Sequence, residues 1–298
     1  MMKTKTKMVI MLCILILLVS SITTYYYGRF IAPGQYRFTA STLTSDTLDA
    51  SISNFRIAFI SDIHLHTKED LDRLARIVED INEHDFHMVI FGGDLYDGTP
   101  FDEAQVISIL KSINSTHGKF AIQGEKDLLY NNEITSILND SGFELLHNEY
   151  RKIYYQDTAF ALFGLENNGD ISALINNDNK DMFQLVVVHE PDYFEEAAKQ
   201  NIDLQLSGHS LGGYVNLPIY GPVFRRSNAQ NFVNGKHQIG QSTLLISNGL
   251  GLESAHRFRL FTANEILSIS LSGTKEEEEI PVDTSPNIEE EQEEELEP

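Results

Sequence analysis

Four times along the chain, a short apolar run of strand type is followed by a helical pattern. In the first unit the run at 55–60 precedes a segment, 68–84, in which Leu71, Leu74 and Val78 recur at helical spacing. The other three units are 88–91 with 102–113, 120–122 with 133–138, and 183–188 with 191–199. Strands joined by helical crossovers lie parallel, so the alternation predicts an α/β fold.

Two further pairs of strand-type runs have no helix between their members. They are 152–156 with 159–163, and 243–247 with 266–271. Such runs favour antiparallel pairing, so the sequence predicts a mixed sheet or two packed sheets. With 298 residues, of which 42% are apolar and 22% charged, the chain can bury the core of one such domain, which we expect at 53–273.

Three lysines at the N-terminus precede an uncharged, largely apolar run from 8 to 27. A run of 20 residues has the length of a membrane-spanning helix, and the tyrosines at its end suit the lipid–water interface. A cleaved signal peptide has a similar basic start, but no A-x-A-like cleavage site follows, which favours an uncleaved transmembrane anchor. The lysines place residues 1–7 in the cytoplasm and the body of the protein outside, at the cell membrane.

Two segments have the composition of chain outside a core. Residues 28–52 are rich in Ser and Thr and are expected to be a linker, while 274–298 combine Glu and Pro and are expected to be a disordered, acidic tail. That tail holds 12 of the 44 acidic residues, and the formal charge of −22 leaves the rest of the chain acidic as well. Nucleic-acid binders present clustered Lys and Arg, so we expect no nucleic-acid partner.

Acidic and imidazole side chains follow five of the predicted strands. They lie in the segments 61–64, 92–94, 124–127, 189–191 and 207–210. In open α/β folds the ligand site lies at the carboxyl ends of the strands, so these side chains are expected to converge. A single His or Asp at such a place is commonly a hydrogen-bonded surface group or a helix cap, but five in the same context favour a metal site.

The order of these motifs resembles that of the calcineurin-like metallophosphoesterases: D-x-H, G-D, G-N-H-[DE], a lone His, and G-H-x-H. The resemblance spans about 55–271, and Gly212-Gly213 together with Ser-Asn-Gly-Leu-Gly at 247–251 is similar to the bacterial membrane-anchored branch of phosphodiesterases and lipid-sugar pyrophosphatases. It implies a four-layer αββα sandwich of two mixed sheets flanked by helices. It also implies a centre of one or two divalent metal ions, for which Mn, Fe, Zn and Mg all remain open.

Carried over position by position, the resemblance assigns most of the metal ligands. Asp62 and His64 would hold the first metal, Asp94 would bridge both, and His189 and His209 would hold the second. The family uses the metals to activate water for attack on phosphorus and to offset charge on the phosphoryl oxygens.

The chain departs from the family pattern at three positions. Glu125 replaces an Asn ligand of the second metal, Lys126 replaces the His that assists the leaving group, with Asp127 as its expected partner, and Leu211 replaces the last His. Glu125 can still coordinate a metal, and Lys126 can stabilise phosphate charge, but Leu211 can ligate nothing. His66 is a substitute ligand if its loop permits.

The sequence therefore favours an active phosphoesterase with a modified metal site, acting on a phosphomonoester, a phosphodiester or a pyrophosphate. The substrate would be a phosphorylated small molecule or a lipid-linked compound near the membrane. One alternative is a degenerate member of the family that binds a phosphorylated ligand without turnover. A second is a serine hydrolase, because 208–212 is a literal G-x-S-x-G around Ser210, although the Gly- and Pro-rich segment that follows leaves little room for the required helix.

Overall fold

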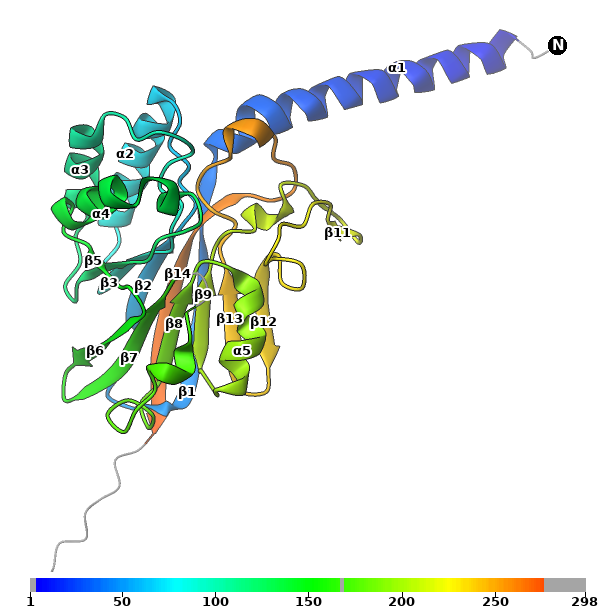
Figure 1. Ribbon diagram of the computed structural model, residues 1–298. Coiled ribbons are helices and arrows are strands. Elements are labelled where there is room, and N and C mark those ends of the chain that lie inside the picture. Colours follow the sequence, from blue (N-terminus) through cyan, green and yellow to red (C-terminus); the bar gives the residue numbers. More distant parts are fainter. Residues whose placement is uncertain (1–3, 167–168, 276–298) are drawn as a thin grey trace, which may run out of the picture.

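Residues 4–166 and 169–275 are described by the computed structural model, in which two six-stranded mixed sheets lie face to face (Figure 1). In spatial order the first sheet contains β1 (Tyr36–Asp49), β14 (Asn264–Lys275), β2 (Phe55–Ile60), β3 (Met88–Phe91), β4 (Lys119–Ala121) and β5 (Glu144–Leu145). The second contains β12 (Gly235–Ile239), β13 (Ser242–Ile246), β9 (Leu204–Ser207), β8 (Gln184–Val188), β7 (Thr158–Leu165) and β6 (Glu149–Tyr155).

Helices cover the outer faces of both sheets, which confirms the predicted four-layer architecture. The helices α2 (Lys68–Asn82), α3 (Glu103–Lys111) and α4 (Asn131–Asp140) share one apolar core with the first sheet. The short helix α5 (Phe194–Lys199) packs on the second sheet. A separate core fills the space between the sheets. On β2, Ile57 and Phe59 point into that space, whereas Ala58 and Ile60 face the helices, as the alternation of side chains along a strand requires.

The strands β2 to β5 run parallel, and so do β13, β9, β8 and β7. The carboxyl ends of the central strands therefore lie at one edge of the double sheet, which is where the site is built. The predicted antiparallel pair at 152–156 and 159–163 is confirmed as β6 and β7.

Two expectations about the strands are wrong. The runs at 243–247 and 266–271 lie in different sheets: β13 pairs antiparallel with β12, and β14 pairs antiparallel with β2. The segment 28–52, expected to be a linker, contains β1, which runs parallel to β14 along the edge of the first sheet. Its Thr residues, which suggested a linker by composition, are β-branched and suit a half-exposed edge strand.

The N-terminal helix α1 (Thr4–Tyr26) projects away from the sheets and is exposed along its whole length (Figure 1). It continues through a π-helical turn, Tyr27–Ile31, and is long and apolar enough to cross a membrane, a property that a signal sequence shares. Most of the expected acidic tail, 276–298, lies outside the described residues.

Candidate metal centre

Three side chains from three strand ends meet between the sheets. Asp62 follows β2, Asp94 follows β3 and His189 follows β8, and one ligand atom from each lies within 4.8 Å of the others. All three residues are buried. Both carboxylates come from the first sheet and the imidazole comes from the second, so the cluster exists only because the two sheets pack with these edges together.

The His189 ring is oriented toward the two carboxylates. Its Nδ1 hydrogen-bonds the carbonyl oxygen of Gly92 at 2.7 Å. Its Nε2 lies 3.3 Å from Oδ2 of Asp94 and 4.0 Å from Oδ1 of Asp62. A ring nitrogen that donates to a backbone carbonyl leaves the other nitrogen with its lone pair free, which is the usual arrangement of a metal-binding histidine.

His64 and His209, two further predicted ligands, lie beside these three residues. Nε2 of His64 lies 3.7 Å from Asp62 and 3.8 Å from Asp94. The backbone N–H of His209 donates to both carboxylate oxygens of Asp62, and its Nε2 hydrogen-bonds the carbonyl oxygen of Ser227 at 2.7 Å. Its ring lies 5.1 Å from that of His189, between centroids.

Five buried ligand atoms of this group have no hydrogen-bond partner. They are both ring nitrogens of His64, Nε2 of His189, Nδ1 of His209 and Oδ2 of Asp94. Buried polar atoms are nearly always paired, so orphaned ligand atoms within and beside this cluster indicate a partner that accepts lone pairs. Imidazole and carboxylate together fit a divalent metal ion of the Mn, Fe, Zn or Mg type, and the residues present therefore fit the metal that the sequence predicts.

The electrostatics of the cluster keep its carboxylates ionised. Burial alone would raise the pKa of the Asp94 carboxyl, but the His189 and His64 imidazoles outweigh burial and hold that pKa below its usual range. The pKa of Asp62 is lowered for the same reason. The carboxylates in turn raise the pKa of His189 well above its ordinary value, against the effect of burial. The ionised carboxylate is the form that binds a cation.

The backbone around the cluster is strained. Asp62, His64, Asp94, His209 and Leu211 all have positive φ, between 47° and 65°. Non-glycine residues in this region are uncommon, and each such conformation costs on the order of 1–3 kcal/mol, so they persist where surrounding contacts hold them. Here the contacts include hydrogen bonds from the backbone N–H groups of Asp62 and His64 to the loop after β3.

Glycines let the strand-end loops approach these carboxylates. A Cβ on Gly208 would overlap Oδ2 of Asp62, and a Cβ on Gly124 would overlap Oδ1 of Asp94. The two glycines belong to the motifs after β9 and β4, which explains why those motifs need a residue without a side chain at these positions.

Two other predicted site residues lie elsewhere. The Glu125 side chain is 41% exposed and pairs with Arg226, so the structure does not bring it into the cluster. Lys126 pairs with Glu253, whose Oε1 is 3.1 Å from Nζ, and not with Asp127.

The buried Asp127 carboxylate has a positioning role. It accepts hydrogen bonds from the backbone N–H groups of Asp94, Leu95 and Gly124 at 2.7, 2.9 and 3.0 Å. Burial, together with the charge of Asp94, raises the pKa of this carboxyl to about 6. Asp127 therefore holds the loop that carries Asp94, and the expectation that it pairs with Lys126 is wrong.

A polar network beside the cluster contains residues that the sequence did not identify. The Tyr214 hydroxyl donates to Oε2 of Glu253 at 2.6 Å, and Nη1 of Arg226 lies 2.9 Å from Oε1 of the same carboxylate. Glu253 thus joins two cations, Arg226 and Lys126, next to the loop that carries Asp94. The Arg226 side chain is only 14% exposed. The sequence feature that could have identified Arg226 is its place in a stretch, 204–252, that contains no acidic residue.

Neither Leu211 nor Ser210 contributes a chemical group to the cluster. Leu211 is fully buried against Tyr214 and Leu252. The Ser210 hydroxyl accepts a hydrogen bond from the N–H of Gly212 at 3.3 Å, and only a three-residue turn follows it, so the strand-turn-helix required of a nucleophilic serine is not formed. His66 is exposed and its Nδ1 hydrogen-bonds the carbonyl oxygen of Asp97, away from the cluster.

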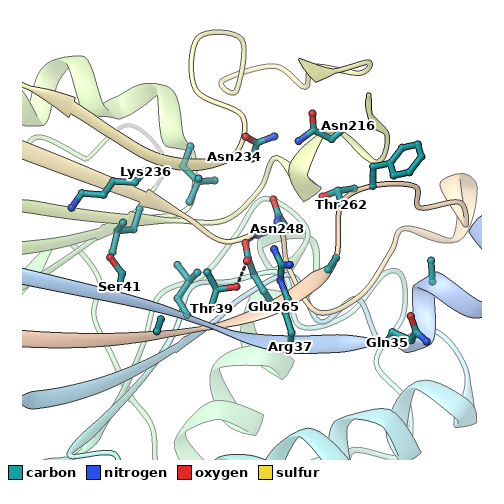
Figure 2. A pocket seen from close by; sticks show the side chains of 18 of the residues that line it. Gln35, Arg37, Thr39, Ser41, Asn216, Asn234, Lys236, Asn248, Thr262 and Glu265 are labelled. Carbon is teal, nitrogen blue, oxygen red and sulfur yellow. Dashed lines mark hydrogen bonds between the residues drawn. The ribbon is translucent and has the colours of Figure 1, made fainter. Parts of the chain in front are cut away.

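A large cavity lies away from this cluster. It has a volume of about 840 Å³ and opens between the edges of the two sheets, lined by β1 and by the loops around β12 and β13 (Figure 2). None of the predicted metal ligands lines it. Asn216, Asn234, Asn248 and Thr262 point toward one another at its end (Figure 2).

A two-sheet fold with carboxylates and imidazoles at the facing strand ends is that of a metallophosphoesterase domain. Residues 55–213 match the family described as calcineurin-like phosphoesterase, and the chain belongs to this family. Membership makes it a phosphoester hydrolase, and the family resemblance inferred from the motifs is confirmed.

Three relatives have similar sequences over most of the chain. It is 28% identical to the uncharacterized metallophosphoesterase YkuE of Bacillus subtilis, over 84% of the chain and 90% of the relative. It is 24% identical to the phosphodiesterase YaeI of Escherichia coli, over 82% of the chain and 92% of that protein. A transmembrane protein with metallophosphoesterase domain from Danio rerio is 24% identical, over 76% of the chain and 55% of the relative.

Proposed function

We propose that this protein is a membrane-anchored metallophosphoesterase that hydrolyses a phosphodiester or pyrophosphate bond in a lipid-linked substrate, with phosphomonoesters as the other possible class. The observation that carries the proposal is the buried group of Asp62, Asp94 and His189, together with orphaned ligand atoms on Asp94, His189, His64 and His209. The similarity to a protein named as a phosphodiesterase supports the diester class. The apolar helix α1 supports an anchor, with the domain outside the cytoplasm.

Asp62, Asp94 and His189 would hold the metal, with His64 and His209 as further ligands. A bound divalent cation would supply Lewis-acid stabilisation of the negative charge that develops on the phosphoryl oxygens. The chain itself places Arg226 and Lys126 in a network with Glu253, beside the loop that carries Asp94. The guanidinium and the ammonium would donate hydrogen bonds to phosphoryl oxygens, and donors placed in advance favour the more highly charged transition state.

Lys126 acts in this scheme as a fixed positive charge. Burial would lower the pKa of its ammonium group, but the hydrogen bond and the charge of Glu253 raise that pKa above its ordinary value. The ammonium therefore stays protonated at neutral pH and orients phosphate oxygens, and it does not carry the leaving-group proton that the family histidine would supply.

The experiment is an assay of the full chain in detergent with an aryl phosphodiester, in the presence of Mn, Zn, Fe or Mg or of a chelator. We expect turnover that requires metal and is abolished by Asp94→Asn. Asp157→Asn is the matched control, because this exposed carboxylate lies in the turn between β6 and β7. Turnover that persists in chelator, or in the Asp94 variant, contradicts the proposal.

Leu211 favours one alternative, a ligand-binding protein without turnover, because a metal that lacks one ligand is held more weakly. This alternative predicts that metal and inorganic pyrophosphate together raise the melting temperature of the full chain, although no ester is hydrolysed under any condition. The same preparation therefore distinguishes the two functions.

A further inference from the structure

The stretch from 204 to 252 contains no Asp or Glu, although the chain has 44 acidic residues. It carries Arg225, Arg226 and Lys236 and is therefore positively charged within a protein of net charge −22. Of these three, Arg226 is paired with Glu125 and Glu253, whereas Arg225 is exposed and can attract an anionic partner on that side.

A small hairpin in this stretch exposes large apolar side chains. Its strands are β10 (Asn216–Leu217) and β11 (Gly221–Pro222). At the tip, Ile219 is 102% exposed and Tyr220 is 87% exposed. Leu217, Val223 and Phe224, at the base, are also exposed. Ile219 has a φ of +75°, which is unfavourable for a β-branched residue, so the backbone holds this side chain away from the domain at a cost.

Two backbone hydrogen bonds, made by consecutive residues, connect this hairpin to the turn that follows α1. The backbone N–H of Arg259 donates to the carbonyl oxygen of Gly28 at 2.9 Å. The next residue, Leu260, accepts from the N–H of Asn216 at 3.0 Å, which is the first residue of β10. Phe258 stacks on Tyr25 of α1, with ring centroids 6.2 Å apart.

The hairpin and the helix also share an apolar surface. A cavity of about 320 Å³ is lined by Tyr25 and Arg29 from the helix end, by Val215 and Phe224 from the two sides of the hairpin base, and by Phe258. Figure 1 shows α1 leaving the domain on the side where β11 projects. A bilayer crossed by α1 would therefore meet this hairpin.

We propose that the β10–β11 hairpin is a second membrane contact, which inserts Ile219 and Tyr220 into the interface of an anionic bilayer while Arg225 faces the lipid phosphates. The inference rests on the membrane anchor of the proposed function. Apolar tips with aromatic and basic flanks are the chemistry of interfacial insertion, and anionic headgroups attract nearby Lys and Arg. Arg226, on the same loop, reaches Glu253 beside the metal ligands, so insertion would hold the site at headgroup level.

A site held at headgroup level would select the class of substrate. A phosphate at headgroup level, attached to a lipid, would lie beside Arg226 and Lys126 without leaving the bilayer. A water-soluble phosphodiester would gain nothing from the hairpin.

The test uses the full chain in vesicles of phosphatidylcholine and phosphatidylglycerol that contain nitroxide-labelled lipids as fluorescence quenchers. Cys13 is the single cysteine and lies in α1, so a fluorophore on it reports whether the helix enters the bilayer. In a Cys13→Ser background, Tyr220→Cys reports on the hairpin. Tyr154→Cys is the matched control, since Tyr154 is 67% exposed on β6, at the end of the domain away from α1 (Figure 1).

We expect the label at position 220 to be quenched by nitroxides near the headgroups at least about twofold more than the label at 154, and less so when phosphatidylglycerol is left out. Quenching at Cys13 without excess quenching at 220 overturns the hairpin proposal and leaves the anchor intact. No quenching at Cys13 overturns the anchor and the hairpin proposal together. Shielding of position 220 that depends on protein concentration in detergent overturns it in favour of a contact between two copies. None of these readouts uses catalytic activity.

Discussion

Replacing Leu211 by His would restore the ligand that the family pattern places at this position. Leu211 is fully buried, and its Cδ2 and the Cβ of Asp62 both lie within 3.0 Å of the point where a Cβ on Gly249 would stand. The imidazole would therefore reach the edge of the metal cluster. The left-handed φ of 51° at this position also suits His better than Leu.

Without metal, Leu211→His should lower the free energy of unfolding. Loss of a buried Leu side chain removes about 2–3 kcal/mol, and an unpaired buried imidazole costs about 1–3 kcal/mol more. The sum of about 4 kcal/mol corresponds to a melting temperature lower by roughly 10 °C for a domain of this size. With metal, one more ligand should tighten binding by at least about tenfold, or ~1.4 kcal/mol.

The assay is thermal unfolding of the full chain over a metal titration, compared with Leu211→Gln, which buries a polar side chain without an imidazole. We expect both variants to be destabilised in chelator and only the His variant to recover stability as metal is added. Equal metal dependence in the two variants would refute the reasoning, since it would mean that position 211 does not face the metal.

Three further outcomes are expected. Gly249→Ala should lower stability by about 2–4 kcal/mol in urea unfolding and weaken metal binding, because Gly249 has a φ of +76° and a Cβ there would press on Asp62; unchanged metal affinity would contradict the close approach. Burial would raise the pKa of Glu253, but Tyr214 and Arg226 lower that pKa to about 2. The stability that the Glu253 carboxylate adds is therefore complete above its ordinary pKa of 4.5 and is lost as pH falls toward 2. Unfolding free energies of wild type and Glu253→Gln should therefore converge below pH 4.5, and a constant difference would exclude this origin. Removal of metal by chelation should lower the melting temperature of wild type and leave that of Asp94→Asn unchanged.

Local patterns were sufficient for most of the fold. The alternation of apolar runs with helical spacing identified β2, β3, β4 and β8 together with their helices, because burial on both faces leaves a continuous apolar run and amphipathic packing leaves a 3.6-residue period. The pattern could not identify β1, whose side chains are half exposed and polar. It also could not assign β13 and β14 to different sheets, because the sequence of a strand does not show which other strand it pairs with.

The sequence by itself determined which residues stand at the strand ends, and hence that Asp62 and Asp94 lie together, because the carboxyl ends of parallel strands share one edge of a sheet. The packing of the two sheets then brought His189 to them. Only the tertiary structure decided which of the neighbouring side chains face the site and which face away from it. Asp127 turned inward to hold the loop of Asp94, and Glu125 turned outward to Arg226. A side chain's direction after a strand depends on backbone dihedrals and on charges brought from distant loops, and neither is encoded in the local spacing of residues.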